Sequence, residues 1–302
     1  MGYPIIGDEY LTSHYKQCKY TPYLKESMNK VRAKKALGQH FLTNLSAAQS
    51  IGESILPWKG IPVLEIGPGM GVLTQVLLDL DFELYLLEID HESVEYLQKN
   101  FPYFADGRCL TEGDVLHLPE EKLIPEKPDT PFVMIGNYPY NISSQIFFRL
   151  LDLRDRVPCC AGMLQKEVAE RLCASPGGRD YGILTVLLRC WYDAEYLFTV
   201  SELDFDPPPK VKGGVLRLVR NQRTSLPCDE ALFKKVVKTA FGQRRKTLRN
   251  ALKSLFGDSY DYSLPIFSLR AERLDVEEYI WLTQEYEKLL QEDCVKEEST
   301  KE

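Results

Sequence analysis

The chain contains 302 residues, of which 44% are hydrophobic and 27% are charged. This composition excludes an intrinsically disordered or collagen-like chain, and the length favours two domains of about 150 residues each. The formal net charge of -7 argues against a surface that is basic throughout for binding nucleic acid.

Residues 1–33 are polar and aromatic without a clear period, and we interpret them as an N-terminal extension. Between residues 61 and 137, apolar runs alternate with amphipathic stretches. We predict strands at 61–66, 84–89 and 131–135, and helices at 72–80 and 91–100. Strands that alternate with helices form a parallel sheet covered on both faces, so we expect an α/β domain over residues 34–221.

The pattern changes after residue 221, where apolar positions recur at helical spacing and no strand pattern interrupts them. Asp275 and Glu278 have the spacing of a capping box before a last helix that we expect to end near Leu290. We therefore predict a small all-helical domain over residues 222–291, followed by a frayed acidic tail at 292–302.

Cysteine and histidine spacing gives no sign of a disulfide framework or a metal site. The eight cysteines include no C-x-x-C pair, and the four histidines lack metal-ligand spacing. No apolar run reaches about 18 residues, and the N-terminus lacks the pattern of a secretory signal. We expect reduced thiols, no metal, no membrane segment and a cytoplasmic protein.

A glycine-rich loop follows the first strand of the α/β domain, with glycines at Gly67, Gly69 and Gly71. Such a loop lets a ligand lie against bare backbone, and Glu88, which closes the next strand, is placed to accept hydrogen bonds from a ribose. The dinucleotide pattern G-x-G-x-x-G would need glycine at Val72 or Thr74. The observed spacing favours a nucleoside cofactor without a pyrophosphate, S-adenosylmethionine, over NAD or an empty turn.

Asp114, in the segment EGDVL at 112–116, is expected to end a further strand between those at 84–89 and 131–135. It would lie at the same sheet edge, where an acid can accept from the adenine amino group of the cofactor. An aspartate after a strand is also a common turn residue, so both interpretations stay open.

The tetrad Asn137-Tyr138-Pro139-Tyr140 follows the next apolar strand. It suits methylation of an exocyclic amine. Two acceptors bind the amino hydrogens, and this makes the lone pair of the nitrogen available for reaction. The Asn137 side-chain oxygen and the Tyr138 carbonyl are the candidate acceptors, Pro139 fixes the backbone between them, and Tyr140 offers a ring for base stacking. The alternative is a strand-ending turn with aromatic packing.

Six segments resemble the ribosomal RNA adenine dimethyltransferases, specifically the bacterial small-subunit enzymes, over roughly residues 32–290. The matching segments are KALGQHFL at 35–42, LEIGPG at 64–69, NYPYNIS at 137–143, QKEVAER at 165–171, FDPPPKV at 205–211 and AFGQRRKTLR at 240–249. The resemblance implies a Rossmann-like methyltransferase domain. It also implies transfer of four methyl groups from S-adenosylmethionine onto two adjacent adenosines in the 3′-terminal hairpin loop of 16S ribosomal RNA, linked to small-subunit biogenesis.

The resemblance also implies roles for individual residues. His40 and Leu42 correspond to cofactor contacts of the family. The residues already inferred from the motifs above also correspond to family cofactor contacts: Gly67, Gly69, Glu88, Asp114 and Asn137. Phe205 corresponds to a second aromatic against the target base. The family commonly has leucine where this chain has Tyr138. The proposed role uses the backbone carbonyl at this position, so the different side chain should be tolerated. Lys212-Gly213 stands where the family often has Asp-Ser, so the chain departs from the family pattern at this position.

A basic stretch at 234–253 carries eight lysines and arginines and no acid, which leaves -15 for the rest of the chain. We expect it to bind the RNA backbone, because phosphates attract such a run. Arg245, Arg249 and Lys253 are spaced as a stripe on one helix face, although a solvated helix face is the alternative. The candidate RNA-binding residues are Lys234, Lys235, Arg244, Arg245, Lys246, Arg249 and Lys253.

We expect a monomeric RNA methyltransferase. The sequence leaves two other functions open, a DNA adenine methyltransferase that uses the same tetrad and a non-catalytic ribosome-assembly factor that binds RNA. The first would need a base-reading domain, for which the short helical region leaves little room. The second could lose the tetrad or the cofactor acids, and both are intact.

Overall fold

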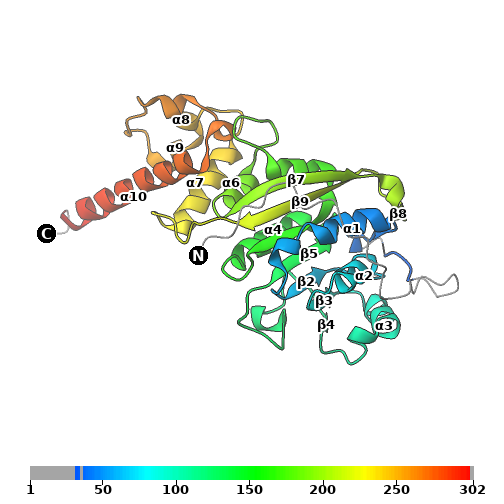
Figure 1. Ribbon diagram of the computed structural model, residues 1–302. Coiled ribbons are helices and arrows are strands. Elements are labelled where there is room, and N and C mark those ends of the chain that lie inside the picture. Colours follow the sequence, from blue (N-terminus) through cyan, green and yellow to red (C-terminus); the bar gives the residue numbers. More distant parts are fainter. Residues whose placement is uncertain (1–30, 35–36, 300–302) are drawn as a thin grey trace.

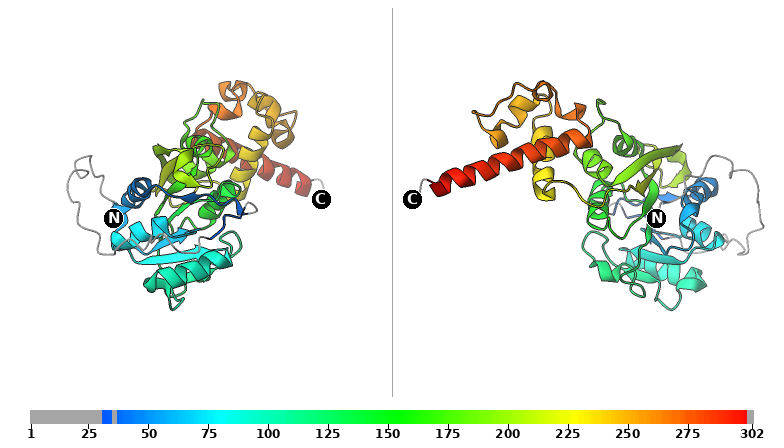
Figure 2. Two further views of the ribbon diagram at one scale, coloured as in Figure 1. Left: turned by 90° about the vertical axis from the view of Figure 1, so that its right-hand side faces the viewer. Right: turned by 60° about the vertical axis from the view of Figure 1, so that its left-hand side comes forward.

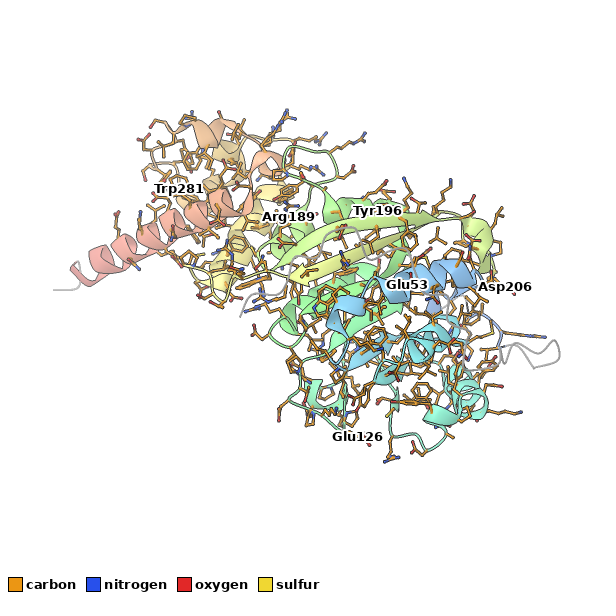
Figure 3. All side chains as sticks on the ribbon, viewed as in Figure 1. Glu53, Glu126, Arg189, Tyr196, Asp206 and Trp281 are labelled. Atoms are coloured by element: carbon orange, nitrogen blue, oxygen red, sulfur yellow. The ribbon has the colours of Figure 1, made fainter. Side chains whose placement is uncertain are left out.

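The computed structural model describes residues 31–34 and 37–299, so nearly all of the predicted N-terminal extension lies outside the described residues. A sheet flanked by helices fills the larger part of the molecule, and a group of helices packs beside it (Figure 1). In Figure 3, Trp281 marks the helical part and Asp206 marks the other end of the view.

The central sheet has seven strands in the order β4-β3-β2-β5-β6-β9-β7. Neighbours from β4 to β6 pair in parallel, whereas β9 is antiparallel to both β6 and β7. The predicted parallel sheet is thus confirmed, with two antiparallel pairings added at one side. The strands are β2 Val63–Ile66, β3 Leu84–Glu88, β4 Leu110–Glu112, β5 Val133–Asn137, β6 Cys159–Gln165, β7 Tyr192–Val200 and β9 Gly213–Arg220.

Successive residues of the central strands point to opposite faces, so each strand contributes to two hydrophobic cores. In β2, Val63 belongs to the core beneath α1, α2 and α3, and Leu64 belongs to the core shared with α4, α5 and α6. This three-layer arrangement explains why the central strands are apolar on both faces, apart from a few residues such as Glu65. The helices are α1 Leu45–Glu53, α2 Val72–Asp79, α3 His91–Asn100, α4 Ser143–Asp152, α5 Lys166–Cys173 and α6 Ile183–Arg189.

The C-terminal part is helical, as predicted, and packs against the α4–α6 side of the sheet domain. Its helices are α7 Glu230–Gly242, α8 Leu248–Ala251, α9 Lys253–Phe256 and α10 Val276–Ser299. The capping box before α10 is confirmed: the backbone N–H of Glu278 donates to Asp275 Oδ1 at 2.9 Å, and that of Asp275 donates to Glu278 Oε2 at 2.8 Å.

Two predictions about this part are wrong. Helix α10 does not end near Leu290 but continues to Ser299, projecting away from the body of the protein (Figures 1 and 2). Arg245, Arg249 and Lys253 do not lie on one continuous helix, because the chain is extended at Thr247 and a break at Leu252 separates α8 from α9. Arg245 lies in the turn after α7, whereas Arg249 lies in α8 and Lys253 begins α9. Thr247 causes the break by adopting an extended conformation and bridging to Arg270.

Candidate active site

A cleft lies at the carboxyl ends of β2, β3 and β5, where parallel strands bring the loops after them to one edge of the sheet. It encloses about 970 Å³, open solvent included. All the predicted cofactor-contact and tetrad residues line it: His40, Leu42, Gly67, Gly69, Glu88, Asp114, Asn137, Tyr138, Pro139 and Tyr140.

The three glycines of the loop after β2 all have positive φ angles, of 66°, 57° and 80° in chain order. Their surroundings differ. A Cβ on Gly69 would lie 2.8 Å from the Phe41 ring, and one on Gly71 would lie 2.5 Å from the Phe101 ring. A Cβ on Gly67 would meet only Pro139 Cδ, at 4.0 Å. Gly69 and Gly71 therefore permit close packing, whereas the missing side chain of Gly67 leaves space in the cleft.

The Glu88 carboxylate ends β3 and holds the glycine loop in place. Its Oε2 accepts the N–H of Gly69 at 3.0 Å, and its Oε1 accepts those of Ile89 and Asp90, both at 2.9 Å. Burial raises the pKa of Glu88, and the three backbone donors oppose that shift. Because each carboxylate oxygen can accept two hydrogen bonds, Oε2 keeps the capacity to accept one from a ligand.

Asp114 follows β4 at the rim of the same cleft. Its Oδ1 accepts the N–H of Leu116 at 2.9 Å, and its Oδ2 lies 2.8 Å from His117 Nδ1. The turn interpretation and the ligand interpretation are therefore compatible, since the same side chain closes a local turn and faces the cleft.

The side chain of Asn137 has a defined orientation. Its Nδ2 donates to the backbone carbonyl of His40 at 2.9 Å. A carbonyl can only accept, so the amide nitrogen must face His40, and Oδ1 remains available as an acceptor. The His40 ring in turn donates from Nδ1 to the carbonyl of Pro207 at 2.8 Å and lies 5.8 Å from the Tyr140 ring, measured between centroids.

The two tyrosines of the tetrad have different surroundings. Tyr138 is 1% exposed, and its hydroxyl donates to the Ala161 carbonyl at 3.0 Å, so the ring anchors the loop in the core. Tyr140 lines the cleft, and its buried hydroxyl has no hydrogen-bond partner within the described part of the chain. Of the two rings, only that of Tyr140 is therefore placed beside the cleft.

Phe205 differs from the other predicted base contact. It is 4% exposed, belongs to the core that includes Leu42 and Met163, and does not line the cleft. Its strand β8, Phe205–Asp206, pairs with β1, Phe41–Leu42. In this structure Phe205 supports the wall of the site, and stacking on a base would require its ring to move.

The basic stretch of the helical part divides into paired and unpaired side chains. Lys253 forms an ion pair with Asp258, Arg244 lies 3.6 Å from Glu272, and Lys235 donates to the Tyr286 hydroxyl at 2.9 Å. Within the described residues, Arg245, Lys246 and Arg249 are exposed and form no ion pair. Arg249 Cζ also lies 5.9 Å from the centroid of the Tyr262 ring. These three cations, together with Lys234 and Lys238, have no carboxylate partner among the described residues and can attract phosphate.

Glu65 also lines the cleft, although it is absent from the residues predicted from the sequence. It is 1% exposed in the middle of β2 and accepts a hydrogen bond from Thr74 Oγ1 at 2.7 Å. Burial raises its pKa to about 8. The available signal was a single acidic residue inside an otherwise apolar strand.

Comparison with known proteins decides the family. The family model described as ribosomal RNA adenine dimethylase matches residues 30–265. The chain belongs to this family. It is therefore a methyltransferase of the adenines of ribosomal RNA that uses S-adenosylmethionine, which confirms the predicted enzyme class and cofactor.

Curated relatives and solved structures agree. The ribosomal RNA small subunit methyltransferase A of Parabacteroides distasonis is 60% identical over 257 residues, which are 85% of this chain and 94% of that protein. The protein of the same name from Porphyromonas gingivalis is 57% identical and covers 85% of this chain and 98% of its own length. A dimethyladenosine transferase from Plasmodium falciparum superimposes with a TM-score of 0.66 at 26% identity, covering 82% and 98% of the two chains.

Within the described residues, no helix is both long and apolar enough to cross a membrane. The same residues contain no group of three or more histidine, cysteine or acidic side chains placed to hold a metal ion.

Proposed function

We propose that this protein dimethylates two adjacent adenosines in the 3′-terminal hairpin loop of 16S ribosomal RNA during small-subunit maturation, acting as a cytoplasmic monomer. The names of the relatives support the small subunit as the source of the RNA. The observation that carries the mechanism is the Asn137 amide, which His40 holds with Oδ1 free to accept.

The cleft fits S-adenosylmethionine. The space beside Gly67 admits a ligand against bare backbone, and Oε2 of Glu88 can accept from a ribose hydroxyl. Asp114 at the rim is placed to accept from an adenine amino group. The bound cofactor supplies an electrophilic methyl group, and the protein supplies the position of the amine that receives it.

The target adenosine enters the same cleft with its ring against Tyr140. In the first transfer, Asn137 Oδ1 and the Tyr138 carbonyl accept the two hydrogens of the adenine amino group, and in the second transfer one of them accepts the single hydrogen that remains. The amino nitrogen then becomes more tetrahedral, and its lone pair is withdrawn from the ring and directed at the methyl group. The methylated ammonium is acidic and releases its proton to water, so orientation rather than a tuned base supplies the rate.

RNA affinity comes from the exposed cations Arg245, Lys246 and Arg249 of the helical part. We expect their replacement by glutamine to weaken RNA binding and to reduce the slope of log K against log salt by about 0.7 for each phosphate that the variant no longer neutralises. Lys253→Gln is the matched control, because Asp258 already pairs with Lys253. An unchanged slope in the triple variant would place the RNA elsewhere.

The decisive experiment uses labelled S-adenosylmethionine, unmodified small subunits and mass mapping of the product. Asn137→Ala should abolish methyl transfer while RNA binding and cofactor binding persist. Gln75→Ala is the control, because this residue lies on α2 outside the cleft lining and its amide nitrogen donates to Asp79 Oδ1 at 3.1 Å. Full activity of Asn137→Ala would refute the mechanism, and methylation at other nucleotides would refute the proposed target.

A further inference from the structure

A second cleft lies at the opposite edge of the sheet, at the amino ends of its strands. Pro62, Pro131 and Pro158, which precede β2, β5 and β6, line it together with residues 220–224 of the connection to the helical part. It encloses about 1490 Å³, open solvent included. The cofactor loops occupy the carboxyl ends of the same strands, so the proposed methyl-transfer chemistry does not use this cleft.

Three arginines line this cleft with their side chains largely buried. The side chains of Arg154, Arg220 and Arg223 are 20%, 16% and 25% exposed. Arginine stays charged when buried, so each guanidinium needs compensation by an anion. For two of them the compensation comes from the helical part, since Arg154 donates to Glu230 at 2.8 Å and Arg223 pairs with Glu277.

Arg220 lacks such a partner. It donates to the carbonyls of Arg154, Trp191 and Asn221 at 3.3, 2.9 and 3.4 Å and to Asn221 Oδ1 at 3.3 Å, and all of these acceptors are neutral. The carboxylate that faces it, Asp155, is 4.0 Å from Nη2 and is itself 79% exposed. Burial lowers the pKa of Arg220, and the charge of Arg154 adds to that effect. A buried cation here therefore carries positive charge that the described residues do not neutralise at hydrogen-bond distance.

Trp191 holds the two guanidiniums together. The Cζ atoms of Arg154 and Arg220 lie 4.3 and 5.1 Å from the centroid of its ring, which is 5% exposed. Two like charges are thus fixed on one aromatic ring, at the wall of an open cleft. An anion at this wall could accept hydrogen bonds from both guanidiniums.

We propose that this cleft binds a phosphate group, held by the guanidiniums of Arg220 and Arg154 with Arg223 at the rim. Planar guanidiniums bind phosphate through paired hydrogen bonds, which suits either a phosphate of an RNA backbone or a free phosphate ester. Because Arg154 and Arg223 also contact the helical part, a bound phosphate would stabilise the junction between the two parts of the protein.

The test is calorimetric titration of the full chain with inorganic phosphate at constant ionic strength. Arg220→Gln should weaken phosphate binding more than about tenfold, since it removes a charged hydrogen-bond partner. Asp155→Asn should strengthen binding about three- to fivefold, because it removes the opposing negative charge beside Arg220. Arg108→Gln, an exposed arginine outside the cleft, should leave it unchanged.

Asp155→Asn keeps the test independent of folding, because Asp155 is exposed and the expected effect is a gain. The proposal is overturned if the wild-type protein shows no saturable phosphate binding, or if Arg220→Gln and Asp155→Asn both bind like the wild type. The KM for unmodified small-subunit RNA then identifies the source. It falls in Asp155→Asn if the phosphate belongs to RNA and stays constant if it belongs to a free ester. The titration needs no methyl transfer, so its failure is separate from failure of the proposed function.

Discussion

Replacing Glu65 with glutamine should remove a large pH dependence of stability. Glu65 lies in β2 between Leu86 of β3 and Ile135 of β5, and Thr74 donates to its Oε2 at 2.7 Å. Burial raises its pKa from 4.5 to about 8, and the Glu88 charge adds to the shift. In the folded protein Glu65 is therefore neutral where an unfolded glutamate is charged.

The sign follows from linkage. A group with a raised folded pKa binds more protons in the folded state, so its stabilising contribution is fully present below pH 4.5 and is lost as the pH rises to about 8. One pKa unit corresponds to about 1.36 kcal/mol. Between about pH 5.5 and about pH 8, this residue should lower the free energy of unfolding by about 3 kcal/mol.

The assay is urea unfolding followed by circular dichroism across that range. Glutamine keeps an oxygen for Thr74 and cannot titrate, so the Glu65→Gln protein should lose about 3 kcal/mol less stability than the wild type between the two pH values. Glu121→Gln, an exposed residue, is the control for the loss of a carboxylate. Equal pH dependence in the wild type and Glu65→Gln would show that Glu65 is charged in the fold and would refute the reasoning.

Three further predictions concern the cofactor loop and the tetrad. Gly67→Ala should fold with a penalty of about 1 kcal/mol for its positive φ but bind S-adenosylmethionine weakly. Gly71→Ala should instead lose stability, because its Cβ would collide with Phe101. Melting curves measure the stability of both variants, and titration with the cofactor measures their binding. Glu88→Gln should weaken cofactor binding about tenfold or more, as measured by calorimetry. Both carboxylate oxygens of Glu88 accept backbone N–H groups, so the amide nitrogen of glutamine would have to face one of these donors. Tyr138→Phe should cost about 1 kcal/mol in urea unfolding and leave methyl transfer intact; loss of activity would contradict a role for the backbone alone.

Much of the α/β domain could be predicted because its signals are local. The helix at 91–100 matches α3, and the strands at 61–66 and 84–89 lie within two residues of β2 and β3. The glycine loop, Glu88 and Asn137 were recognisable because each lies at the carboxyl end of a strand of a parallel sheet, and such strands place their carboxyl ends at one edge.

The basic stretch shows the limit of local patterns. A spacing of four residues places Arg245, Arg249 and Lys253 on one face only if the helix is continuous, and the pairing of Thr247 with Arg270 interrupts it. The length of α10 was also mispredicted, because its last turns follow a polar sequence without a breaking residue.

The sequence by itself determined the alternation of strands and helices between residues 61 and 137, the positions of the glycine-rich loop and the tetrad, and the concentration of positive charge at 234–253. These features depend on hydrophobic period and on residues within a few positions of each other. Only the tertiary structure decided which cations are free, that Phe205 is buried, and that Asn137 presents its oxygen to the cleft. Each of these depends on a contact between segments distant in sequence, such as Asn137 with His40, and local periodicity carries no information about such contacts.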